Sequence, residues 1–124
     1  MRLSRVEFER LVAQAVDALP PKVARHLENV EIVVEDAPTP EELESAGQDP
    51  DETLLGIYQG VPQSQRGSWY GSVLPDRVIL YQRPIEAAAR TKPGIRREVR
   101  ITLLHEIGHH FGLDESELAE TGYE

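Results

Sequence analysis

The chain has 124 residues, and its 40% hydrophobic and 28% charged residues are typical of a folded domain, so we expect one domain over residues 1–124. The net charge of −9 argues against nucleic acid as a partner, and the chain lacks the run of roughly 18 apolar residues that a membrane helix needs. The absence of cysteine excludes disulfides and thiolate metal sites, which leaves His, Asp and Glu as metal ligands. The first residues are charged and lack the apolar core of a secretion signal, so we expect a cytoplasmic protein with no membrane partner.

The first residues carry the pattern of a capped amphipathic helix. Ser4 and Glu7 form a capping-box pair, in which each satisfies a backbone N–H of the first turn. Apolar residues then recur at spacings of three and four until Pro20-Pro21 prevents continuation. The sequence therefore predicts a packing helix that starts at Ser4.

The next segments alternate short elements with loops. Residues 22–27 predict one short helical turn, and Val30–Glu35 has the β-branched content of a strand. His26 stands alone in that turn, so we interpret it as a surface histidine without a ligand role. Residues 36–53 are rich in Pro, Asp and Glu and predict a solvated loop, with a flap over a site as the alternative. Residues 54–60 are apolar, are bounded by turn residues and predict a second strand.

The middle of the chain predicts a hairpin followed by helices. Residues 69–71 and 77–81 flank a Pro-Asp turn and are typical of an antiparallel pair of strands. Residues 84–89 begin with proline, which favours the first position of a helix. Pro93-Gly94 is expected to break this helix, and a long helical pattern begins near Ile95.

The residues with metal chemistry lie close together near the C-terminus. The stretch from His105 to His109 is a complete His-Glu-x-x-His motif. On a helix of about 3.6 residues per turn, positions four apart lie on one face, so the imidazoles of His105 and His109 can reach one ion. Glu106 lies about 100° around the helix, where its carboxylate can hydrogen-bond a water held on that ion. This placement suits a general base.

The rest of this helix is expected to anchor the motif and to end soon after it. We expect an apolar stripe to bury against the sheet, formed by Leu103, Leu104, Ile107 and Phe111. Gly108 marks a close approach of a strand or a substrate, and Gly112 is placed to end the helix in the left-handed conformation.

Two acidic residues that follow the helix are candidates for a third metal ligand. Glu115 lies ten residues after His105, where the extended His-Glu-x-x-His-x-x-Gly-x-x-His pattern has its third histidine, and Asp114 is the alternative. His110 is outside the ligand register, so a packing or supporting role is expected for it.

With this motif and with residues 60–77, the chain resembles the small bacterial zincin-like metallopeptidases, the minimal zincins, whose third zinc ligand is acidic. The resemblance extends over most of the chain and is most specific over residues 54–118. It implies an α+β fold, with a short mixed β-sheet packed against an N-terminal helix and a C-terminal active-site helix. It also implies one zinc ion per chain, bound by His105, His109 and Glu115, with Glu106 as the catalytic base.

The leading hypothesis from these residues is a zinc metallopeptidase that acts on a peptide or protein substrate. An extended substrate would add to an exposed sheet edge, for which residues 69–73 and 77–81 are the candidates. Tyr70 and Tyr81 could donate a phenol to the tetrahedral oxyanion, although packing is the plainer role for both and for Trp69. The acidic net charge predicts weak binding of acidic substrates.

Two other hypotheses stand beside the peptidase. Met1 is the only methionine, so the methionine turn below the metal of the larger metzincins is excluded. A metal-binding interaction module with little or no hydrolytic activity is therefore the alternative to an enzyme. A third hypothesis treats the helix as purely structural and predicts no metal. The substrate sequence, the native metal and the oligomeric state do not follow from the sequence.

Overall fold

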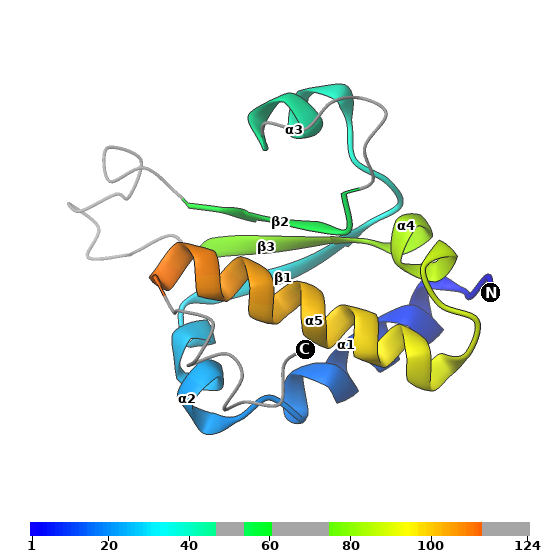
Figure 1. The fold of residues 1–124 in the computed structure, drawn as a ribbon, viewed down its shortest axis with the longest axis horizontal. Coiled ribbons are helices and arrows are strands. Elements are labelled where there is room, and N and C mark those ends of the chain that lie inside the picture. Colours follow the sequence, from blue (N-terminus) through cyan, green and yellow to red (C-terminus); the bar gives the residue numbers. More distant parts are fainter. Residues whose placement is uncertain (47–53, 61–74, 113–124) are drawn as a thin grey trace.

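A mixed β-sheet with helices on both faces organises the residues that the computed structural model describes, which are 1–46, 54–60 and 75–112 (Figure 1). The strand order is β1 (Val30–Glu35), β3 (Asp76–Tyr81), β2 (Gly56–Gln59). The central strand β3 is parallel to β1 and antiparallel to β2. This confirms the expected α+β class.

The larger core lies between one face of the sheet and two long helices, α1 (Arg5–Asp17) and α5 (Lys92–Phe111), which run beneath it in Figure 1. The Ser4 side chain accepts a hydrogen bond from the backbone N–H of Glu7, so the predicted cap of α1 is confirmed. Ten side chains of the two helices and β3 form the centre of this core: Phe8, Leu11, Val12, Val78, Leu80, Ile95, Val99, Leu103, Leu104 and Ile107. Because burial of each such side chain contributes about 1.5–3 kcal/mol, α5 is firmly anchored.

The opposite face of the sheet carries a smaller apolar cluster. Ile79 and Tyr81 alternate along β3 with the residues that face the larger core, and they pack with Leu54 and Ile57. Leu43 and Ala46 cover this cluster from a short helix, α3 (Pro40–Ser45), which lies on the far side of the sheet from α1 and α5 (Figure 1).

The helix α3 corrects the expectation of a loop over residues 36–53. Thr39 and Glu42 form a complete capping box, and Pro40 occupies the first helical turn. Leu43, the large aliphatic residue of this acidic segment, reaches the second apolar cluster. The helix therefore combines a strong start signal with one apolar anchor, while residues 47–53 lie outside the described residues.

A buried polar network fixes the N-terminus to the helix α4 (Gln82–Ala87). Glu86 is 4% exposed and accepts hydrogen bonds from the backbone N–H of Leu3 at 2.9 Å and from the Gln82 amide at 2.9 Å. The Arg83 guanidinium donates to the other carboxylate oxygen at 2.7 Å. Each oxygen of the Glu86 carboxylate therefore has a donor.

Several element boundaries differ from the expected ones. The helix α4 starts two residues before Pro84, because β3 runs directly into it. The helix α5 starts at Lys92, where Thr91 caps it and Pro93 falls in the first turn, which tolerates proline.

The segment 22–27 forms the short helix α2 (Pro21–Ala24) and the 3₁₀ turn η1 (Arg25–Leu27), close to expectation. Among the described residues, the structure has no helix with the length and apolarity needed to span a membrane.

The position of β3 corrects the proposed substrate edge at residues 77–81. This strand is paired on both sides, so its backbone has no unpaired edge for another strand. The described sheet instead ends at β1 and β2. Residues 69–73, the other candidate edge and one arm of the expected hairpin, lie outside the described residues.

Candidate metal centre

The second half of α5 brings His105, Glu106 and His109 to one cleft. All three side chains line a cleft of about 460 Å³ between α5, β2 and the end of α3. The other residues that line it are Ala46, Leu54, Leu55, Gly56, Ile101 and Thr102. The helix ends just beyond the motif at Gly112, whose φ of 69° is the expected left-handed cap.

The two imidazoles have the spacing and chemistry that a zinc ion requires. Their ring centroids are 6.1 Å apart with an interplanar angle of 86°. Zinc–nitrogen bonds of about 2.0–2.1 Å place two rings that share one ion roughly 5–6 Å apart, which is close to the observed separation. Both side chains are exposed to the cleft and neutral imidazole is a preferred zinc ligand, so His105 and His109 fit this metal.

A third ligand does not come from the described part of the chain. No group of three His, Asp or Glu residues within it is arranged to hold a metal ion. Asp114 and Glu115, together with Trp69 and Tyr70, lie outside the described residues. The assignment of Glu115 as a ligand therefore stays a prediction.

Gly56 allows the motif helix to lie against β2. A Cβ atom added at this residue would lie 2.7 Å from the Thr102 methyl carbon and 2.9 Å from the backbone oxygen of Ile79. Neither distance leaves room for a side chain, so only glycine permits this approach of α5 to the strand. The close contact places Glu106 beside the outer edge of β2.

Glu106 is half-buried, and its carboxylate faces the backbone N–H of Tyr58. Burial raises the pKa of this carboxyl, and the Tyr58 N–H and the nearby His109 offset part of the rise. The N–H of Tyr81 donates to the carbonyl oxygen of Leu55 at 2.9 Å, so the backbone of Leu55 faces β3. Successive residues of an antiparallel strand alternate in direction, so the N–H of Tyr58, three residues further along, points away from β3. The candidate base therefore lies at the edge of β2 that faces away from β3.

The side chain of Tyr58 connects the end of α5 to β3. Its ring stacks on His110 at 3.8 Å with an angle of 14°, and its hydroxyl donates to Asp76 at 2.8 Å. The His110 Nε2 lies 3.8 Å from the same carboxylate. His110 thus has the packing role that its position outside the ligand register predicts.

The expected apolar stripe is correct for three of its four residues. Leu103, Leu104 and Ile107 are fully buried, whereas Phe111 is 39% exposed, so its predicted burial against the sheet is wrong. Phe111 lies in the last turn, beyond the sheet-covered part of α5, and stacks on His26 at 4.4 Å. His26 is therefore a packing partner of the helix end, and Phe111 stays partly exposed although it also contacts the Tyr58 ring edge-on at 6.1 Å.

Tyr81 packs in the second apolar cluster. Its side chain is fully buried, and it is not among the described residues that line the cleft. Burial and the nearby Glu42 carboxylate raise the pKa of its hydroxyl. The oxyanion role considered for Tyr81 has no support from this placement, and the packing role fits.

Sequence reasoning missed Gly56 and Tyr58, two residues of β2 that contact the motif helix. A glycine inside an apolar strand pattern is a known sign of close backbone approach, and this signal was present at Gly56. Nothing in the sequence indicates that the backbone of Tyr58 faces Glu106, because this contact depends on the register between β2 and α5.

The fold agrees with the comparisons with known proteins. Residues 27–123 match the family of zincin-like metallopeptidases, and the chain belongs to this family. No curated protein matches the chain. A solved structure with a similar fold is that of a conserved hypothetical protein from T. thermophilus, with a TM-score of 0.55 and 23% identity over 88% of this chain and 94% of that chain.

Proposed function

We propose that the protein is a zinc-dependent metallopeptidase that hydrolyses peptide bonds with Glu106 as general base. The observation that carries the proposal is the half-buried Glu106 carboxylate, which shares one cleft with two imidazoles on the same helix. His105 and His109 would hold the metal, together with Glu115 as the proposed third ligand. Family membership supports the same reaction class.

The chemistry divides between the metal and the chain. A bound zinc ion lowers the pKa of a coordinated water toward about 7 and polarises the peptide carbonyl. The Glu106 carboxylate would accept the proton of the attacking water and then deliver it to the leaving amine. Burial supports this role, because it raises the pKa of Glu106 and so favours acceptance of a proton.

The edge of β2 that has no partner strand among the described residues would hold the substrate. An extended peptide that adds to this edge would use the outward backbone groups of β2, including the N–H of Tyr58. The Glu106 carboxylate faces that N–H in the free protein. A bound peptide would therefore compete with Glu106 for this donor and release the carboxylate toward the reacting bond.

The first test is the metal content of the protein purified without a histidine tag, measured by elemental analysis. We expect about one zinc ion per chain in the wild type and its loss in His109→Ala, because the motif then retains one imidazole. Zinc in the wild type with no cleavage of any peptide in a broad screen would favour the metal-binding interaction module instead. No zinc in either protein after zinc is added back would refute the metal site.

A further inference from the structure

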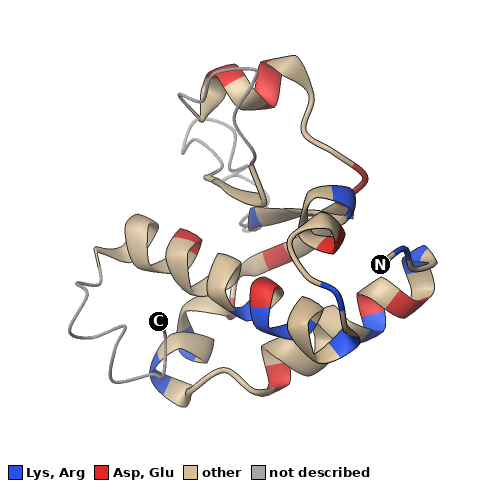
Figure 2. Cartoon of the chain, turned by 45° about the vertical axis from the view of Figure 1, so that its right-hand side comes forward, with Lys and Arg blue, Asp and Glu red and all other residues tan. Residues whose placement is uncertain are grey.

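The first half of α5 is basic, although the chain as a whole has a net charge of −9. Four of its nine residues from Lys92 to Arg100 are Lys or Arg and one is Glu. Figure 2 shows the blue segments of these residues on the same helix that carries the motif further along. The net charge therefore does not describe the local charge at this end of the cleft.

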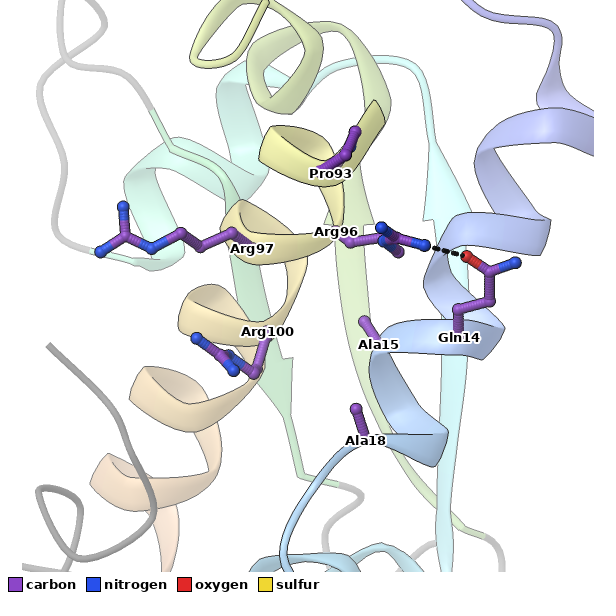
Figure 3. A pocket seen from close by; sticks show the side chains of 7 residues that line it. All are labelled: Gln14, Ala15, Ala18, Pro93, Arg96, Arg97 and Arg100. Carbon is purple, nitrogen blue, oxygen red and sulfur yellow. Dashed lines mark hydrogen bonds between the residues drawn. The ribbon is translucent and has the colours of Figure 1, made fainter. Parts of the chain in front are cut away.

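The arginines of this half point in two directions (Figure 3). Arg96 reaches toward α1 and donates to the Gln14 amide oxygen at 2.9 Å, beside a cavity of about 350 Å³ between α1 and α5. Arg97 and Arg100 extend away from α1 (Figure 3). All three arginines line this cavity, but only Arg96 bonds to α1, and the side chains of Arg97 and Arg100 leave it on the other side.

Arg97 lies in the same helical row as the metal-binding residues. Each step of four residues turns by about 40° around a helix, so Arg97, Ile101, His105 and His109 form a row that winds gradually around α5. The last three of them line the cleft. Arg97 therefore occupies the next turn of the row, just beyond the cleft.

The guanidinium of Arg97 is available to a ligand. The side chain of Arg97 is exposed, and its guanidinium makes no ion pair or hydrogen bond within the described part of the chain. The Nε of Arg100, one turn further along, is buried without a hydrogen-bond partner among the described residues, and this arginine adds a second positive charge. Glu98 is the one carboxylate of this half-helix.

The distance along the helix fixes where a substrate would meet Arg97. With a rise of about 1.5 Å per residue, the Cα atoms of Arg97 and His105 are about 12 Å apart. An extended peptide advances about 3.4 Å per residue, so this distance spans three or four residues of substrate. An arginine binds carboxylates through paired, charge-assisted hydrogen bonds.

We propose that Arg97, with Arg100 adding positive charge, selects peptides that carry Asp or Glu three or four residues from the scissile bond. The proposal rests on the proposed peptidase function, because it assumes that an extended peptide follows α5 through the cleft. The net charge of the chain predicts weak binding of acidic substrates, whereas this proposal expects an acidic residue to be preferred at one position of the substrate. Exposed ion pairs are modest, so we expect a preference of about threefold to fivefold over Gln at that position.

Cleavage-site mapping tests the position of the preferred acid. The zinc-loaded wild type is incubated with a synthetic library of random decapeptides, and the cleaved bonds are identified by mass spectrometry. We expect Asp and Glu to be enriched three or four residues from the cleaved bond on one side. The enrichment is expected to disappear in Arg97→Ala, to turn toward Lys and Arg in Arg97→Glu, and to persist in the matched control Arg96→Ala. No enrichment, or one that survives Arg97→Ala, would overturn the proposal.

A binding experiment separates this proposal from the peptidase function. Fluorescence anisotropy measures the Kd of two labelled decapeptide pools for Glu106→Gln, one with Glu and one with Gln fixed at every third position. Tighter binding of the Glu pool that is lost on adding Arg97→Ala, without cleavage of any peptide by the wild type, would refute the peptidase function and keep the acidic preference. Equal Kd values for the two pools would overturn the acidic preference, whatever the cleavage result.

Discussion

Two glutamates of this small domain lose much of their contact with water, yet their pKa values move in opposite directions. Burial acts to raise the pKa of both Glu86 and Glu106. At Glu86, hydrogen bonds from Gln82, the N–H of Leu3 and Arg83 outweigh burial, and the pKa lies below its ordinary value. At Glu106, the Tyr58 N–H and His109 only reduce the rise. The donors at Glu86 therefore outweigh the effect of burial, whereas those at Glu106 do not.

This difference separates a carboxylate that stabilises the fold from one that is placed to react. The donors on both oxygens of Glu86 hold it in its charged form and fix the N-terminus to α4. Glu106 shares its cleft with the imidazoles and has one backbone donor, which a substrate strand would take. Perturbed carboxyl groups in clefts are candidates for acid–base chemistry, whereas saturated ones are typical of structural networks.

The largest expected effect is on activity, at Glu106. We expect Glu106→Gln to lower kcat/KM by about 10²–10⁴-fold, because the amide cannot accept the proton of the attacking water. Zinc content and the urea midpoint should stay at wild-type values or rise, since the change keeps the side-chain shape and removes a partly buried charge. The exposed Glu9 of α1 provides the matched control, Glu9→Gln, which should not alter kcat/KM. Full activity of Glu106→Gln would refute the role of base.

The next effect is on stability, at Glu86. We expect Glu86→Ala to lower the free energy of unfolding by about 2–4 kcal/mol, because it removes a buried, fully hydrogen-bonded carboxylate and leaves the Leu3 N–H and the Gln82 amide without an acceptor. Urea denaturation followed by circular dichroism measures this change. The folded fraction should keep its zinc content, so a loss of zinc at full folding would contradict the separation of the two regions.

A smaller part of that effect should depend on pH. Because the folded-state pKa of Glu86 lies below its ordinary value of 4.5, its stabilisation is present above that value and is lost as the pH falls through the folded-state pKa. The stability of the wild type should therefore fall with acidification more steeply than that of Glu86→Gln. Urea unfolding at a series of pH values from about 7 to about 3 tests this. Parallel curves for the two proteins would show that the Glu86 pKa is not lowered.

Much of the fold could be predicted from the sequence, because its signals are local. The Ser4–Glu7 cap, the β-branched run of β1 and the left-handed Gly112 each depend on a few neighbouring residues. The Thr39–Glu42 capping box is just as local, and it was missed because the acidic composition around it was interpreted as a loop.

The candidate site was predictable only in part. The placement of His105 and His109 on one face of α5 follows from helical periodicity, so it could be predicted from the sequence. The contact between the Tyr58 N–H and the Glu106 carboxylate joins residues that are 48 positions apart in the sequence. It depends on how α5 crosses β2. The exposure of Phe111 also depends on where the sheet ends beneath α5. Helical periodicity predicts the face on which a residue lies and not how far the sheet extends.

The smallest expected effect tests which part of Tyr58 serves Glu106. Tyr58→Phe removes the hydroxyl that donates to Asp76 at 2.8 Å, and it keeps both the ring on His110 and the backbone N–H on the carboxylate. We expect a loss of about 1 kcal/mol in the free energy of unfolding, the usual contribution of one hydrogen bond, with kcat/KM within about twofold of the wild type. Tyr58→Leu, which also removes the stacked ring, should cost more stability. If Tyr58→Phe instead lowered kcat/KM as strongly as Glu106→Gln, the hydroxyl would be part of the reaction. The wild type and Tyr58→Phe have the same backbone N–H at Glu106. Such a loss would therefore mean that Glu106 also depends on a side-chain donor, which the contrast between the two glutamates does not include.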